Sequence, residues 1–205
     1  MKLIGNGAEA KIYLDEKNNK IIKRRISKTY RIPEIDSQLR KQRTRREARI
    51  LKKLKEFSPA IIESDDINME ISMEYIDGPT IKNFLEKNTK KQRQTVMRKI
   101  GEKIAKMHLL NVTHGDLTTS NMILTKKEVK IIDFGLALVT DQIEHKAVDI
   151  HLLQHSLESK HHQHYEELFK NFLIGYKKNN KDYEAILKRY GIVEKRGRYK
   201  RRMGS

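Results

Sequence analysis

The chain has 205 residues, a length that suits one domain of ordinary size or two small lobes sharing a cleft. It contains no Cys, which excludes disulfides and Cys-ligated metal sites and fits an intracellular, cytoplasmic protein. No apolar run approaches the length of a membrane span, so we expect no membrane segment, and the net charge of +17 points to partners rather than to a fold.

The first 77 residues show mostly strand-like patterns. Their predicted elements are, in chain order, a strand, a glycine turn and a strand within residues 1–25, a loop over residues 26–37, a helix from about Asp36 to Lys55, and two strands within residues 60–76. Pro33 and the lack of a clean apolar period predict the loop. Ala48, Leu51 and Leu54 recur at three-residue steps, which indicates the inward face of the helix.

A turn-forming sequence, Asp77-Gly78-Pro79, marks the boundary that we expect between two lobes. Beyond it, Thr80 is placed to cap a short helix, and a longer helix follows with Ile100 and Ile104 on its inward face. Short strands are predicted within residues 112–135, and helices from about residue 146 to residue 190. We therefore expect an N-lobe over residues 1–77, a C-lobe over residues 78–194 and a basic tail over residues 195–205.

The strongest chemical signal is HGDLTTSN, which begins at His114 and follows an amphipathic helix. Asp133-Phe134-Gly135 comes twelve residues after Asn121, at the end of an apolar strand. Phosphoryl transfer needs Mg²⁺ held by oxygen ligands, for which Asn121 and Asp133 are candidates, and Asp116 is placed to orient or deprotonate the acceptor. The order and spacing fit a protein-kinase catalytic loop. The fold class that we predict is α+β, a minimal bilobal, protein-kinase-like fold with a β-rich N-lobe and a reduced helical C-lobe.

The residues expected to bind ATP lie in the N-lobe. Glycines let a backbone approach phosphates closely, so the predicted phosphate loop comprises Gly5, Asn6, Gly7, Ala8, Glu9 and Ala10. Lys23 follows two Ile residues on the next strand and is the expected phosphate-binding lysine, with Lys20, Arg24 and Arg25 as rivals. Glu47, the one acid among nine bases in residues 39–55, is its expected partner. Backbone groups of Glu74 and Ile76 are expected to meet adenine.

Basic residues gather in two places. Residues 39–55 contain nine Lys or Arg, and the segment after Glu194 contains six without an acid. The basic helix is either a solvated face or a phosphate-binding one. The tail lacks a core-forming pattern, so we expect it to stay mobile and to bind phosphates.

A more specific resemblance rests on the segment Lys28–Leu51, KTYRIPEIDSQLRKQRTRREARIL, with GNGAEA before it and HGDLTTSN after it. Nearly the whole chain, including Ala147-Val148-Asp149, resembles the PRPK-type atypical kinases, the small kinase and ATPase subunit of the KEOPS (EKC) complex. The resemblance implies Mg-ATP binding, autophosphorylation on Ser or Thr, and ATPase activity in the complex. It also implies a role in making threonylcarbamoyladenosine in tRNA, beside a threonylcarbamoyl-transferase subunit and a small activating subunit. The basic tail and helix would then contact tRNA.

Departures from ordinary protein kinases leave alternatives open. Thr118 stands where a lysine usually follows the catalytic Asp, and no APE sequence or long activation segment is present. ATP hydrolysis or transfer to itself is therefore easier to support than phosphorylation of many proteins. The alternatives are a nucleotide-bound scaffold without chemistry, a RIO-type ribosome-assembly kinase and a small-molecule phosphotransferase. His151 and His155 have a zinc-compatible spacing but no evident third ligand, so we interpret them as a surface or partner face.

Overall fold

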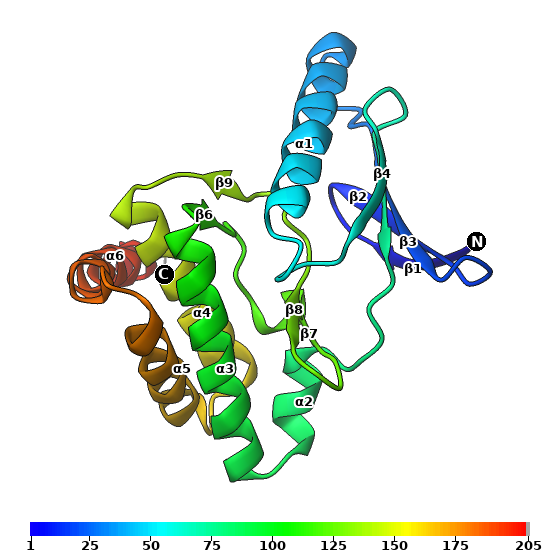
Figure 1. Cartoon of the computed structure of the whole chain (residues 1–205). Coiled ribbons are helices and arrows are strands. Elements are labelled where there is room, and N and C mark those ends of the chain that lie inside the picture. The colour runs from blue at the N-terminus through cyan, green and yellow to red at the C-terminus, as the bar shows by residue number, and fades with distance from the viewer. Residues whose placement is uncertain (204–205) are drawn as a thin grey trace. The chain divides into compact units, whose positions relative to one another are not determined.

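The structure, a computed structural model, describes residues 1–203, with side chains described as far as residue 196. Contacts between Cα atoms divide the chain into two compact units. Unit 1 comprises Met1–Asp77 and Ile132–Gly135, and unit 2 comprises Gly78–Ile131 and Leu136–Ser205. Figure 1 shows strands and one long helix in the first unit and mostly helices in the second.

Unit 1 is built on an antiparallel sheet with the strand order β1-β2-β3-β5-β4. Its elements are β1 (Lys2–Asn6), β2 (Ala10–Asp15), β3 (Lys20–Arg25), α1 (Pro33–Lys53), β4 (Ile61–Asp65) and β5 (Glu70–Glu74). The predicted strands are confirmed, including the two within residues 60–76. The predicted glycine turn joins β1 to β2.

Helix α1 begins earlier than predicted. Pro33 was assigned to a loop, but it occupies the first turn of the helix. Proline is favourable there because its missing N–H would have no intrahelical partner and its φ angle already suits a helix. The predicted inward face is confirmed, since Ala48, Leu51 and Leu54 are all buried.

Unit 2 is mainly helical. Its helices are α2 (Ile81–Lys87), α3 (Lys90–Leu109), the 3-10 turn η1 (Thr119–Asn121), α4 (Ile143–Lys160), α5 (Tyr165–Asn179) and α6 (Tyr183–Met203). Two small antiparallel pairs complete it: β6 (Val112–Thr113) with β9 (Leu138–Val139), and β7 (Met122–Leu124) with β8 (Val129–Ile131). The predicted cap of α2 is confirmed, because the Thr80 side chain accepts a hydrogen bond from the backbone N–H of Asn83.

Helices α3 and α5 approach each other so closely that two glycines meet the opposite backbone. A Cβ atom built on Gly101 would lie 2.1 Å from the carbonyl oxygen of Phe172, and one built on Gly175 would lie 2.0 Å from that of Arg98. Neither position has room for a side chain. This contact fixes the middle of α3, and the catalytic loop follows the end of that helix in the sequence.

The C-terminal helix extends further than the sequence predicted, while the mobility expected of the tail stays a prediction. Helix α6 continues to Met203, so residues 195–203 are helical, and residues 204–205 lie outside the described part of the chain. Arg189 and Arg196 both pair with Glu144 of α4, which extends the contacts of α6 past Glu194. Within the described residues, no helix is both long and apolar enough to cross a membrane.

Candidate active site

Lys23 is held between two carboxylates of unit 1. Its ammonium nitrogen lies 2.6 Å from Glu47 Oε1 and 2.6 Å from Asp133 Oδ1. The Lys23–Glu47 pair predicted from the sequence is present, and both side chains are buried. Burial works against the charge of Lys23, but Glu47 and Asp133 outweigh it and raise the pKa of the ammonium. Lys23 therefore stays protonated at neutral pH.

The pleat of β3 explains why Lys23, and not the adjacent Arg24, lies between Glu47 and Asp133. Side chains two residues apart share a face of a strand, and Lys23 and Arg25 are both buried on the same one. Arg25 donates to the second carboxylate oxygen of Glu47. Arg24 points the other way, is largely exposed and pairs with Glu70.

Asp133 follows β8 in a conformation that few residues adopt. Its φ angle is +63°, in the left-handed region that Asp tolerates better than most side chains. The carboxylate accepts from the backbone N–H of Gly135 at 3.2 Å and remains 53% exposed. The next residue, Phe134, is fully buried and anchors the segment. One Asp133 oxygen thus faces Lys23 while much of the carboxylate stays accessible to a ligand.

Asp116 and Asn121 meet in unit 2. The Asn121 side-chain amide donates to Asp116 Oδ2 at 3.0 Å and to the Asp116 carbonyl at 2.9 Å. Because the amide nitrogen is turned to Asp116, the amide oxygen is the atom that Asn121 can offer to a cation. Gly115 precedes Asp116 with a φ angle of +77°, and a Cβ there would lie 2.5 Å from the Leu136 carbonyl oxygen, so the tight turn requires glycine.

A buried carboxylate on α4 holds the start of this loop. Asp149 accepts from the backbone N–H of His114 at 2.6 Å and from that of Gly115 at 2.8 Å. It also lies 3.2 Å from His108 Nε2, at the end of α3. Sequence reasoning noted Asp149 only as part of the resemblance and gave it no role. The structure shows that it fixes the backbone directly before Asp116.

The same polar cluster continues through His108 to α5. His108 Nδ1 lies 2.7 Å from the hydroxyl of Tyr176, which accepts from the Asn180 amide at 3.1 Å. Burial, and then the charge of Asp149, raises the pKa of the Tyr176 hydroxyl well above its usual range. Neither His108 nor Tyr176 was found from the sequence, because a helix pattern marks such residues only as inward-facing.

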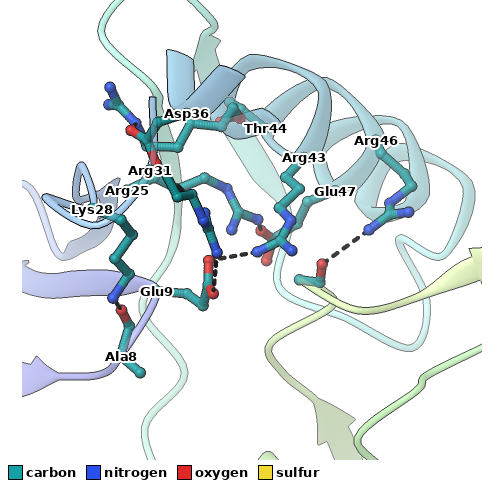
Figure 2. A network of polar contacts seen from close by, with 12 residues as sticks. Ala8, Glu9, Arg25, Lys28, Arg31, Asp36, Arg43, Thr44, Arg46 and Glu47 are labelled. Carbon is teal, nitrogen blue, oxygen red and sulfur yellow. Dashed lines mark hydrogen bonds and ion pairs between the residues drawn. The ribbon is translucent and has the colours of Figure 1, made fainter. Parts of the chain in front are cut away.

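The glycine-rich loop closes the β1–β2 hairpin, as predicted. Gly7 donates its backbone N–H to the carbonyl of Ala10 at 3.0 Å, which forms the turn. Figure 2 shows Glu9 facing arginines from α1 and from the segment before it. On β5, the N–H of Glu74 donates to the Ala60 carbonyl at 2.8 Å, so any adenine contact by Glu74 would use its carbonyl. Ile76, the other predicted adenine contact, is buried.

The predicted site residues thus form two groups. Lys23, Glu47 and Asp133 are assembled within unit 1, and Asp116 and Asn121 within unit 2. Oxygen atoms are the ligands that Mg²⁺ prefers, and it commonly uses one or two carboxylates and keeps several waters, so the donor chemistry of Asn121 and Asp133 fits that ion. Among the described residues, no three His, Cys, Asp or Glu side chains gather as a metal cage.

Comparison with known proteins shows the family to which the chain belongs. Residues 1–164 match the family model of the protein kinase domain. The chain belongs to the protein kinase family. Within that family it is 48% identical to the KEOPS complex subunit Bud32 of Pyrococcus abyssi, with 98% of each chain covered. It is 41% identical to the EKC/KEOPS complex subunit BUD32 of Enterocytozoon bieneusi, covering 98% of that protein.

A third relative is longer than this chain. The probable bifunctional tRNA threonylcarbamoyladenosine biosynthesis protein of Methanocaldococcus jannaschii is 42% identical over 96% of this chain, which spans only 37% of that protein. These relatives confirm the resemblance drawn from the sequence. The chain is therefore a kinase-type phosphotransferase of the Bud32 type.

Proposed function

We propose that this protein binds Mg-ATP and transfers the terminal phosphoryl group to water or to a Ser or Thr hydroxyl of its own chain. The observation that carries the proposal is Lys23, a buried ammonium held between Glu47 and Asp133. Removing three charged groups from water costs free energy. Such clusters therefore usually belong to a ligand-binding site or to a structural network of ion pairs. A lysine with two carboxylates suits a site that must bind phosphates beside a cation.

Each side chain then has a distinct role. Lys23 would bind phosphate oxygens, and Asn121 and Asp133 would hold Mg²⁺, which neutralises charge on the phosphates. Asp116 would orient the attacking hydroxyl or water and accept its proton. A bond forms between the acceptor oxygen and the terminal phosphorus, and the bond from that phosphorus to the bridging oxygen breaks, which leaves ADP.

Hydrolysis or autophosphorylation is supported better than phosphorylation of many proteins. Thr118 provides no positive charge beside the acceptor, and stabilising charge there contributes strongly to transfer. Only residues 136–142 separate the Asp133–Gly135 segment from α4. Such a short connection offers little surface on which a peptide substrate could dock.

We further propose that the protein works in the cytoplasm, in a KEOPS-type complex that makes threonylcarbamoyladenosine in tRNA. The names of its relatives support this assignment, and they favour it over a ribosome-assembly kinase. Its partners would be the threonylcarbamoyl-transferase subunit and a small activating subunit. The basic surfaces of α1 and α6 would contact tRNA.

An Asp116→Asn variant separates an enzyme from a nucleotide-bound scaffold. We expect ATP turnover to fall about a hundredfold, because an amide cannot accept the proton of the acceptor. Nucleotide affinity and thermal stability should change little, since the Asp116 side chain is exposed. Steady-state ATPase assays and calorimetric ATP titrations of the assembled complex test this.

The matched control for this variant is Asp141→Asn, which removes the same charge from another exposed position of unit 2. It should leave turnover unchanged. If the Asp116→Asn complex modifies tRNA at the normal rate, the scaffold function is correct and the enzymatic proposal is wrong.

Removing residues 197–205 should weaken tRNA binding and flatten its salt dependence. The deletion removes four basic residues but keeps Arg196, which pairs with Glu144, so α4 and α6 should stay together. Each lost phosphate contact lowers the slope of log K against log salt by about 0.7 to 0.9. Filter-binding titrations at several salt concentrations measure that slope.

A control with Lys126 and Lys127 replaced by Gln removes exposed charge from the β7–β8 turn instead. It should leave the slope nearly unchanged. An identical slope for the truncated and full chains would rule out a role for the end of α6 in tRNA binding.

A further inference from the structure

The glycine-rich loop is tied to unit 1 through the side chain of Glu9. Arg43 of α1 donates to Glu9 Oε2, and Arg31 approaches Oε1 at 3.6 Å. Figure 2 shows both guanidinium groups reaching Glu9 from separate parts of the chain. The Glu9 carboxylate is 42% exposed, so this side chain is not part of the core. A carboxylate that binds two arginines at the tip of a turn restricts how far that turn can move.

The segment before α1 holds the backbone of the same loop. Ile26 donates its N–H to the Glu9 carbonyl at 3.3 Å, and the Lys28 ammonium donates to the Ala8 carbonyl. The loop is therefore held by its main chain as well as by Glu9. Of these two donor residues, Lys28 begins the segment on which the family resemblance rests, and Ile26 lies just before it.

Arg31 is itself anchored on a buried carboxylate. Asp36, in the first turn of α1, lies 3.5 Å from Arg31 Nη1 and accepts from Arg40 Nε at 2.7 Å. Burial opposes the charge of Asp36, but Arg40 and Arg31 outweigh it and lower the pKa of the carboxyl. Asp36 thus stays ionised at neutral pH and fixes Arg31 in place for Glu9.

Arg43 connects the loop to the helix that orients Lys23. Arg43 and Glu47 are four residues apart on α1, so they lie on one face of the helix, one turn from each other. Glu9 binds the first, and Lys23 binds the second. The glycine-rich loop and the lysine strand are consequently both positioned against the same turn of α1.

The face of α1 beneath the loop carries more positive than negative charge. Arg46 donates to the Gly135 carbonyl at 3.3 Å, and its Nε is buried without a hydrogen-bond partner among the described residues. Burial, and then the charges of Arg43 and Arg25, lowers the pKa of Arg46. Glu9 offsets part of this mutual repulsion. Without Glu9, the glycine-rich loop would offer no negative side chain to Arg31 and Arg43.

We propose that Glu9, Arg31 and Arg43 form a clamp that holds the glycine-rich loop in place for nucleotide phosphates. The inference rests on the proposed binding of ATP. Glu9 and Arg43 act as positioning residues, because they fix the loop backbone whose N–H groups would meet the phosphates. A loop that is already ordered binds its ligand more tightly, since less conformational entropy is lost on binding.

The test compares Glu9→Gln and Arg43→Gln in the full chain. Hydrogen exchange of residues 5–10 without nucleotide should become faster in both variants. Affinity for ATP and ADP should fall about three- to tenfold for Glu9→Gln, which loses two ion pairs, and about two- to fivefold for Arg43→Gln, which loses one. Affinity for adenosine, which has no phosphates, should not change, and neither should the melting temperature.

Two further variants sharpen the test. The Glu9→Gln/Arg43→Gln double variant should bind ATP no more weakly than Glu9→Gln alone, because the pair it removes is already lost. Arg49→Gln removes the same charge from an exposed position of α1 and should alter neither exchange nor affinity. A merely structural role would instead lower adenosine affinity and thermal stability together with ATP affinity.

The possible results separate this inference from the proposed function. Unchanged exchange of residues 5–10 in both variants overturns the clamp, and so does an equal loss of ATP and adenosine affinity. If the unaltered protein binds neither ATP nor ADP, the proposed function is wrong and the clamp loses its role in phosphate binding. Faster exchange in the variants would then still establish the physical contact between Glu9 and α1.

Discussion

A Lys23→Met variant is expected to turn over ATP about a thousandfold more slowly while the fold persists. Removing one preorganised donor from a site where charge develops costs about two to three orders of magnitude in rate. Here the substitution also removes the 2.6 Å contact between Lys23 and the carboxylate of Asp133. Methionine has a similar length and fills the buried space. Glu47 keeps Arg25 as a partner, so no buried carboxylate is left alone.

Steady-state turnover and circular dichroism are the measurements, and Lys20→Met is the control. Lys20 begins the same strand but is only half-buried, and the pairing register places it beside Glu74 rather than Glu47. The control should retain nearly full turnover. Equal rates for Lys23→Met and the unaltered protein would contradict the assignment of Lys23 to the site.

An Asp149→Ala variant is expected to lower the free energy of unfolding by about 3 kcal/mol or more, because it leaves two backbone N–H groups and His108 without their acceptor. Those N–H groups belong to His114 and Gly115, directly before Asp116. ATP turnover should therefore fall at least a hundredfold, by the loss of positioning that a displaced catalytic group entails. Urea denaturation and turnover assays give both quantities.

Asn at position 149 should have an intermediate effect. The amide oxygen can still accept one of the two backbone N–H groups, from His114 or Gly115. The amide nitrogen is itself a donor, so it cannot accept the other. Ser156→Ala is the matched control, since the Ser156 hydroxyl of α4 makes neutral contacts with the catalytic loop. It accepts from the N–H of Thr119 at 3.3 Å and lies 3.4 Å from the Thr119 hydroxyl. We expect this control substitution to cost only about 1 kcal/mol. Stability losses of similar size in Asp149→Ala and Ser156→Ala would contradict a special role for Asp149.

The parts of the fold that could be predicted are those with local signals. Two adjacent Ile residues before Lys23 placed β3, and the three-residue apolar steps of Ala48 and Leu51 placed the inward face of α1. The partner of Lys23 was predictable because a single acid stands among the bases of residues 39–55. Each of these inferences needs only a short window of sequence.

The parts that were missed depend on contacts between distant residues. The cluster of His108, Asp149 and Tyr176 joins three helices, and nothing in the periodicity of any one helix marks the others. The helical form of residues 195–203 was missed because Arg196 finds its acid, Glu144, more than fifty positions earlier in the chain. Glu9 was assigned to the phosphate loop as one of its members, but its arginine partners could not be deduced from spacing.

Glu47 divides its two oxygens between Lys23 and Arg25, and all three side chains are buried. In protein kinases the corresponding lysine–glutamate contact can serve as a switch, since the helix must be in position for activity. Swinging α1 outward in this molecule would strip Arg25 of its carboxylate and uncouple Lys23 in one movement. Removing a partner from a buried charge costs about 3 to 5 kcal/mol. We therefore expect α1 to stay in the engaged position in the resting protein, held there by the contacts of Glu47 with Lys23 and Arg25.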